Sequence, residues 1–234
     1  FFQSTLIDDE VIEVIKSNIS LAPLHNPPNL AGIEASRNLL PEVPQVAVFD
    51  TAFHRTLSPK AFLYALPYRY YEKYKIRKYG FHGTSYNYVT KKVAKLLKIP
   101  LKELKIIICH LGNGCSISAI DKGESIDTSM GFTPLEGLMM GTRCGDIDAE
   151  ALLFLMEKEN FTISQIDNIV NKQSGLLGIS GISNDVREIE RKAQEGNKRA
   201  KLALEMFTYR IKKYIGAYSA ALGGLDVLVF SAGI

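Results

Sequence analysis

The chain has 234 residues, of which 46% are hydrophobic and 23% charged, and its formal net charge is +3. These values are those of an ordinary globular protein with one large or two small domains, and no apolar run reaches the length of a membrane-spanning helix. The first residues have no basic or apolar region of a signal peptide, and the three cysteines form no CxxC pair, so we expect a cytoplasmic protein without membrane contact.

The first quarter of the chain predicts two helices and one short strand. A helix is expected over Asp8 to Ser17, and a second over Asn29 to Leu40 with its first asparagine as N-cap. Three prolines in Leu21 to Pro28 argue against regular structure between them. The apolar run Gln45 to Phe49 predicts a strand that ends at Asp50.

The middle of the chain predicts short helices followed by a β unit. Helices are expected over Ser58 to Ala65, Tyr68 to Tyr74 and Ser85 to Leu97, the last with a serine cap. The segment Lys105 to Ser129 predicts three strands, joined by a glycine-rich turn and then by a hairpin turn at Asp121 to Gly123. Glycines on both sides of an asparagine let the backbone approach a ligand and point N–H groups at it, as in phosphate sites. An ordinary Asn-Gly hairpin is the alternative.

The last part of the chain predicts four helices and a final strand. The helices are expected over Asp146 to Lys158, Ser164 to Lys172, Asn184 to Glu195 and Lys198 to Leu222, and the strand over Asp226 to Ser231. Antiparallel strands followed by helices and a late isolated strand indicate an α/β fold. We expect a domain boundary near Asp50, and we expect the chain to be part of a longer protein, because it stops directly after a strand.

Six segments in series resemble the acetate kinase family, within the acetate and sugar kinase, Hsp70 and actin superfamily. They are Phe49 to His54, Tyr79 to Ser85, His110 to Gly114 with Ser116, Gly137 to Asp148, Gly181 to Arg187 and Phe230 to Ile234. Each motif is weak alone, but the ordered series covers essentially the whole chain and is highly specific.

The resemblance implies a ribonuclease H-like duplicated-domain α/β fold, with two domains around a cleft. Residues 1–51 would complete the N-terminal domain, and residues 52–234 would form most of the C-terminal, nucleotide-binding domain. It also implies a homodimer that transfers the γ-phosphoryl group of ATP to acetate reversibly, with Mg²⁺, giving acetyl phosphate and ADP.

Three catalytic residues follow from the resemblance. Arg143 matches an arginine that stabilises the transition state, and His82 matches the second stabilising residue. Asp50 matches the active-site aspartate, often described as a proton acceptor. Acetate has no proton to lose at neutral pH, so we expect Asp50 to orient the site through metal-bound water or Arg143. From the residues alone, Arg143 could instead pair with Asp146 or Asp148, His82 could be a packed core histidine, and Asp50 a strand-end cap.

The resemblance also implies binding residues for both substrates. The nucleotide would contact His110, Leu111, Gly112, Asn113, Gly114, Asp185, Val186, Arg187, Gly233 and Ile234. Leu24, Phe81 and Pro134 would line an apolar pocket for acetate. One methylene changes binding by only about 1–3 kcal/mol, so a propionate- or butyrate-preferring kinase remains an alternative. Asp185 also fits the bland interpretation of an acid in the first turn of a helix.

Several family features are expected to lie outside this chain. They are the first phosphate hairpin, a substrate-binding arginine and the metal ligands, so we expect no metal ligand among these residues and poor activity from them alone. A nucleotide-binding fragment without turnover is therefore a second alternative. The tyrosine-rich basic stripe around Lys73 to Lys78 suggests nucleic acid only weakly, because such a stripe on a helix is more often a half-buried surface; we expect no nucleic-acid partner. His25, His54 and Glu136 are assigned no role.

Overall fold

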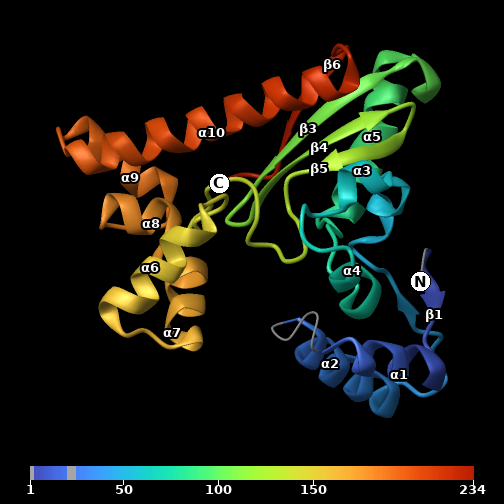
Figure 1. The fold of residues 1–234 in the computed structure, drawn as a ribbon. Helices are drawn as coiled ribbons and strands as arrows, with labels where there is room; N and C mark the ends of the chain where they lie inside the picture. The colour runs from blue at the N-terminus through green and yellow to red at the C-terminus, as the bar shows by residue number, and fades with distance from the viewer. Residues whose placement is uncertain (1–2, 20–24) are drawn as a thin grey trace.

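The structure is a computed structural model, and it describes residues 3–19 and 25–234. The centre of the molecule is a mixed four-stranded sheet of order β5-β4-β3-β6. Its strands are β3 (Lys105–Leu111), β4 (Cys115–Asp121), β5 (Glu124–Thr128) and β6 (Val227–Ser231). The first three are antiparallel neighbours, and β6 pairs parallel with β3. This confirms the predicted β unit and the late strand, and it brings the end of the chain beside the glycine-rich turn (Figure 1).

Helices cover both faces of this sheet. The long helix α10 (Lys198–Leu222) contacts β3 and β4 on one face, and α5 (Gly83–Leu97) packs on the other (Figure 1). The apolar run of β3 alternates between two cores, with Ile107 and Cys109 facing α10 and Ile106 and Ile108 facing α5. Burial on both faces explains why this strand is continuously apolar.

A group of shorter helices lies at the far end of α10, at the lower left of Figure 1. They are α6 (Ala149–Glu159), α7 (Ile163–Asn168), α8 (Gly175–Ser180) and α9 (Val186–Gln194). The predicted helix over Ser164 to Lys172 is α7 followed by a π-helical turn, Ile169–Gln173. Helix α8 was not predicted.

The N-terminal elements form a separate group with their own two-stranded sheet, at the lower right of Figure 1. They are β1 (Thr5–Leu6), α1 (Asp9–Ser17), α2 (Asn26–Leu39) and β2 (Val46–Ala47). Helix α2 begins three residues before the predicted asparagine cap, and the expectation of irregular structure up to Pro28 is wrong over its last residues. Pro27 and Pro28 occupy the first helical turn, where a missing backbone N–H costs nothing.

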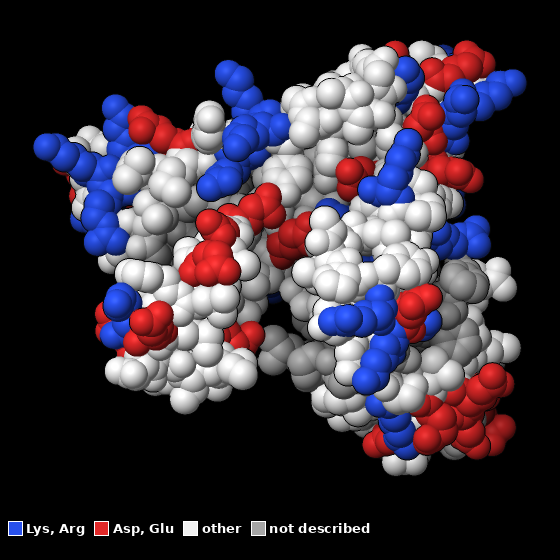
Figure 2. Space-filling model, viewed as in Figure 1, with Lys and Arg blue, Asp and Glu red and all other residues white. Residues whose placement is uncertain are grey.

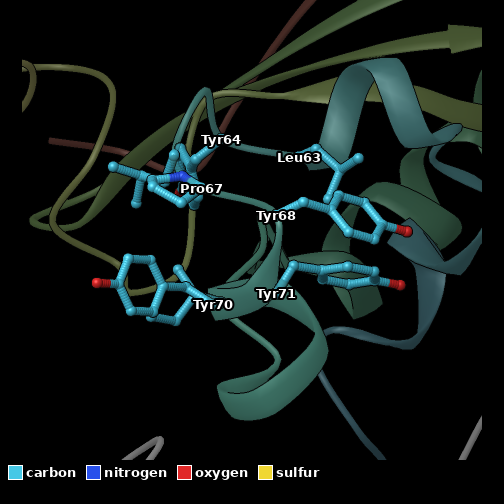
Figure 3. Close-up of a pocket in the computed structure, with 8 residues that line it drawn as sticks. Leu63, Tyr64, Pro67, Tyr68, Tyr70 and Tyr71 are labelled. Carbon is cyan, nitrogen blue, oxygen red and sulfur yellow. The ribbon is translucent and has the colours of Figure 1, made fainter.

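Short elements lie between β2 and β3 in the sequence, on either side of α5. They are η2 (Ala52–Thr56), α3 (Pro59–Phe62), α4 (Arg69–Tyr74) and η3 (Leu101–Glu103). Around α4, tyrosines surround a small pocket (Figure 3), and neighbouring cations stack on the chain's own rings. The Arg77 guanidinium lies 3.8 Å from the centre of the Phe62 ring, and the Lys73 ammonium 4.9 Å from that of Tyr74. Some cations of the tyrosine-rich basic stripe around Lys73 to Lys78 thus contact aromatic rings of the chain itself.

Charged side chains of both signs are spread over the visible surface. Figure 2 shows acidic side chains gathered near α1 at the lower right and basic ones near α9 and α10 at the upper left. Within the described part of the chain, no helix combines the length and apolarity that a bilayer span requires.

Candidate functional site

The glycine-rich turn joins the ends of β3 and β4 and lies beside three other segments. A Cβ atom added to Gly114 would lie 3.4 Å from Arg143 Nη1 and 3.8 Å from the His82 ring. One added to Gly112 would lie 3.8 Å from the Cβ of Ala232, just after β6. The turn therefore lies within van der Waals reach of His82, Arg143 and the residues that follow β6.

Two stacked histidines flank the turn. The rings of His82 and His110 lie 4.2 Å apart between centroids and 22° from parallel. His82 Nδ1 is 2.8 Å from Ser116 Oγ, and His110 Nδ1 is 3.0 Å from Ser85 Oγ. Burial, helped by the neighbouring His110, lowers the pKa of His82 to about 4, and burial also lowers the pKa of His110. His82 is therefore neutral at physiological pH.

Asp50 is exposed and fixes the start of α5. Its carboxylate accepts hydrogen bonds from the backbone N–H groups of His82, at 2.5 Å, and Thr84, at 3.3 Å. Its carbonyl oxygen accepts from the N–H of Gly83, where an added Cβ would lie only 2.1 Å from that oxygen. Asp50 thus caps a helix far away in sequence.

The predicted serine cap of this helix is wrong. His82 occupies the N-cap position in the left-handed conformation, with φ of 58°, and the Ser85 hydroxyl lies against His110 instead. Among the described residues there is no ion pair between Asp50 and Arg143, so the direct contacts of Asp50 reach His82 rather than the arginine.

Arg143 is half-buried, and within the described residues its guanidinium has a neutral oxygen partner: Nη1 donates to the Pro134 carbonyl oxygen at 3.2 Å. The alternative that Arg143 pairs with Asp146 or Asp148 is wrong. Asp146 accepts from Gly137 N and from the Tyr214 hydroxyl, while Asp148 caps α6.

Burial lowers the pKa of Arg143, yet a guanidinium remains a cation in proteins. In the described part of the chain no carboxylate pairs with it. A partly desolvated cation without a counter-charge, beside a glycine turn, is suited to an anion.

The turn is docked onto the loop that carries Arg143. Gly141 N donates to the Asn113 carbonyl oxygen at 3.2 Å, and Asn184 Nδ2 donates to Asn113 Oδ1 at 3.1 Å. A Cβ on Gly141 would lie 2.1 Å from that same Oδ1. Asn184 was not predicted as a site residue, although it lies in a motif that carries the resemblance.

Asp185 and Arg187 are engaged with each other. Asp185 is the N-cap of α9, which corrects its placement in the first turn of a helix opened by Asn184. Its carboxylate accepts from Arg187 N, Nε and Nη2, at 2.9, 3.0 and 2.5 Å. This pairing lowers the pKa of Asp185 to about 2. Val186 packs partly buried against the main core.

The remaining predicted site residues occupy different surroundings. Ile234 packs against the main core, whereas a Cβ on Gly233 would meet no atom within 4 Å. Phe81 is partly buried against the same core, and Leu24 lies outside the described residues. His54, which was assigned no role, is buried between Ser125 Oγ at 2.8 Å and the Phe81 carbonyl oxygen at 2.9 Å.

Metal ligands do not gather in the described ranges, 3–19 and 25–234, where no three His, Cys, Asp or Glu side chains cluster suitably. Glu136 instead binds the Tyr64 hydroxyl and lies 3.1 Å from Lys78 Nζ. These residues by themselves do not fit a protein-held Mg²⁺ ion.

Comparisons with known proteins agree over the whole chain. The acetokinase family model matches residues 1–234. The acetate kinase of Halothermothrix orenii is 63% identical over 234 residues, which cover 100% of this chain and 59% of that protein. The acetate kinase of Dictyoglomus turgidum is also 63% identical, with 58% of its length covered.

Solved structures agree as well. The crystal structure of Porphyromonas gingivalis acetate kinase matches with a TM-score of 0.95 and 52% identity, over 100% of this chain and 58% of that one. A propionate kinase from Francisella tularensis matches with a TM-score of 0.96 and 49% identity, over 100% and 60%. The mixed α/β fold is thus confirmed, and the chain spans a little under three fifths of its relatives' length. The chain belongs to the acetokinase family.

Proposed function

We propose that this chain is the phosphoryl-transfer part of an acetate kinase, which moves the γ-phosphoryl group of ATP to acetate. The observation that carries the proposal is Arg143: a half-buried cation beside Gly114 and His82, without a carboxylate partner among the described residues. Phosphoryl transfer depends mainly on positioning and on neutralising charge on the three equatorial oxygens. This arrangement supplies both.

In the proposed reaction a carboxylate oxygen of acetate bonds to the γ-phosphorus while the bond to the β,γ-bridging oxygen breaks, and ADP leaves with that electron pair. Arg143 neutralises the charge on the transferring group, and His82 donates a hydrogen bond to it. Asp50 holds the backbone of His82 in place. No proton transfer is needed, because acetate enters ionised.

The wider assignments belong to the same proposal. The turn His110 to Gly114 would bind phosphates, while Asp185, Val186, Arg187, Gly233 and Ile234 would contact the nucleotide. Phe81, Pro134 and Leu24 would line the acetate pocket. Residues 1–51 and 52–234 would belong to two domains around a cleft, in a cytoplasmic homodimer. Mg²⁺ would neutralise nucleotide charge with ligands outside this chain.

A preference for propionate is the second candidate, because one of the matching structures is a propionate kinase. The two acids differ by one methylene, which an apolar pocket discriminates by about 10–200-fold at most. Initial rates of the full-length protein with acetate, propionate and butyrate, at saturating ATP, separate these candidates.

The test of the proposal is Arg143→Ala in the full-length protein, with acyl phosphate trapped by hydroxylamine. Loss of the guanidinium should lower kcat by about 10²–10⁴-fold. The matched control is Arg191→Ala, which removes an exposed arginine paired with Glu195 on α9. A decrease below about threefold for Arg143→Ala would remove this residue from the mechanism.

A further inference from the structure

A buried pair of hydroxyl groups lies directly behind His82. Tyr86 follows His82 by one turn of α5, and Ser116 lies on β4, the strand next to β3. The Tyr86 hydroxyl is hydrogen-bonded to Ser116 Oγ, and Ser116 Oγ lies 2.8 Å from His82 Nδ1. Tyr86 and Ser116 are both 0% exposed. The three groups form one continuous chain of hydrogen bonds.

The number of protons on these three groups decides which group donates and which accepts in each hydrogen bond. Burial raises the pKa of Tyr86 far above its ordinary value, so its hydroxyl keeps its proton. Within the described residues Ser116 Oγ is the one hydrogen-bond partner of that hydroxyl. A buried O–H that donates to nothing costs about 1–3 kcal/mol, so Tyr86 donates to Ser116. Ser116 accepts that bond and gives its own single proton to His82 Nδ1.

The direction fixes which nitrogen of His82 carries hydrogen. An imidazole that accepts at Nδ1 while neutral carries its proton on Nε2. That nitrogen faces the turn, since a Cβ on Gly114 would lie 3.8 Å from it. The opposite tautomer would present a lone pair there, which repels phosphoryl oxygens.

We propose that Tyr86 and Ser116 are positioning residues that hold His82 as the neutral, Nε2-protonated tautomer, with its N–H directed at the transferring phosphoryl group. The inference rests on the proposed function for the identity of the anion. The tautomer itself follows from the hydrogen bonds and the burial of these groups, without reference to a substrate, so it is measured separately from turnover.

The first experiment reads the His82 tautomer by ¹⁵N NMR of histidine-labelled full-length protein at neutral pH without ligands. The signals are assigned by their loss in His82→Gln. We expect an unprotonated Nδ1 and a protonated Nε2 in the wild type. Tyr86→Phe, which removes one oxygen atom, and Ser116→Ala should shift the signals toward a mixture of tautomers. A wild-type His82 protonated on Nδ1 would overturn the proposal.

The matched control is Ser118→Ala. Ser118 is equally buried on the same strand, but its hydroxyl binds Ser125 Oγ and the Asp127 carbonyl oxygen, away from His82. It should leave the His82 signals in place. If Ser118→Ala moved them as far as Ser116→Ala does, the effect would be general to the strand and the assignment to Ser116 would fail.

The second experiment uses kinetics to show that the pair acts through His82. Ser116→Ala should lower kcat about 10–100-fold, as loss of an orienting partner does elsewhere, while KM values for ATP and acetate change less than about twofold. The double variant with Tyr86→Phe should be no slower than Ser116→Ala, and Ser116→Ala should have no effect in a His82→Ala background. An equal loss in that background would mean a merely structural role. If the wild type fails to phosphorylate acetate while the tautomer is found as expected, the proposed function fails and the positioning of His82 stands.

Discussion

Replacing Asp50 separates two roles for this carboxylate, positioning and proton acceptance. In the structure its two oxygens accept from the backbone N–H groups of His82 and Thr84. His82 itself has a left-handed backbone, which costs a residue with a side chain about 1–2 kcal/mol. The hydrogen bonds of Asp50 therefore hold a strained residue whose ring carries the proposed hydrogen-bond donor to the transferring phosphoryl group.

The magnitude follows from the cap. Removing a helix-capping side chain costs about 0.5–2 kcal/mol, and asparagine retains one acceptor oxygen where alanine retains none. If about 1–2 kcal/mol is lost from the positioning of His82 in the transition state, the rate falls about 5–30-fold. We therefore expect Asp50→Ala to lower kcat by that factor. Asp50→Asn should be several-fold milder, but below the wild-type rate.

The assay is the kcat of acetyl phosphate formation at saturating ATP and acetate, with urea unfolding of each variant. The matched control is Asp8→Asn, since Asp8 caps α1 in the same way, through Val11 N at 2.8 Å, away from the site. It should lose similar stability and keep its kcat. Equal losses beyond about 10²-fold for both Asp50 variants would indicate proton transfer and refute positioning, and full activity of Asp50→Asn would refute both.

Two further predictions concern the turn and acid stability. In Gly141→Ala the new Cβ would displace Asn113 Oδ1 and break its hydrogen bond to Asn184. The KM for ATP should then rise about 10-fold, because one polar contact that holds the turn is lost. Gly216→Ala on α10, with open space around its Cβ, should leave that KM unchanged. For His54, burial lowers the folded-state pKa to about 4 from its ordinary 6.5, so the unfolded state binds more protons and stability is lost as pH falls from about 6.5 to 4. At 1.36 kcal/mol per pH unit, the loss in the free energy of unfolding amounts to about 3 kcal/mol. Urea unfolding measured across that pH range should show that the free energy of unfolding of His54→Gln depends less steeply on pH than that of the wild type. Equal slopes would contradict the buried-histidine argument.

Elements with a strong local pattern could be predicted from the sequence. The β unit and α10 appear within a residue or two of their predicted bounds, because apolar periodicity and turn residues agree there. Helix α8 could not be predicted. It begins at Gly175 with φ of 63°, and its first residues donate to carbonyls of a distant loop, as Leu176 N does to Met140. Among the described residues, the predicted strand Gln45 to Phe49 appears as the shorter β2, Val46–Ala47, paired antiparallel with β1.

In the candidate site, too, some residues could be named from the sequence, whereas their hydrogen-bond partners could not. Motif residues such as Arg143 and His82 were named from the resemblance, and the structure brings them together at the turn. The partners of these residues lie far away in the sequence. Ser116 is 34 residues from His82, and Pro134 is 9 from Arg143. No local pattern indicates which hydroxyl or carbonyl will meet a given side chain.

The charge of the site has a consequence for how it works. His82, which flanks the turn, is neutral at physiological pH, and the stacked His110 has its pKa lowered as well. The positive charge that lies beside the turn is that of Arg143. In the proposed reaction, a neutral N–H donor would add a hydrogen bond without another full charge, and this would limit how tightly ground-state ATP is held. Binding energy accelerates a reaction only where it is greater in the transition state than in the ground state. In the proposed reaction, one arginine with oriented neutral donors beside it would stabilise the charge that moves during transfer. The orientation of His82 would then matter for the rate, with Asp50 holding its backbone and, as proposed, Ser116 its ring.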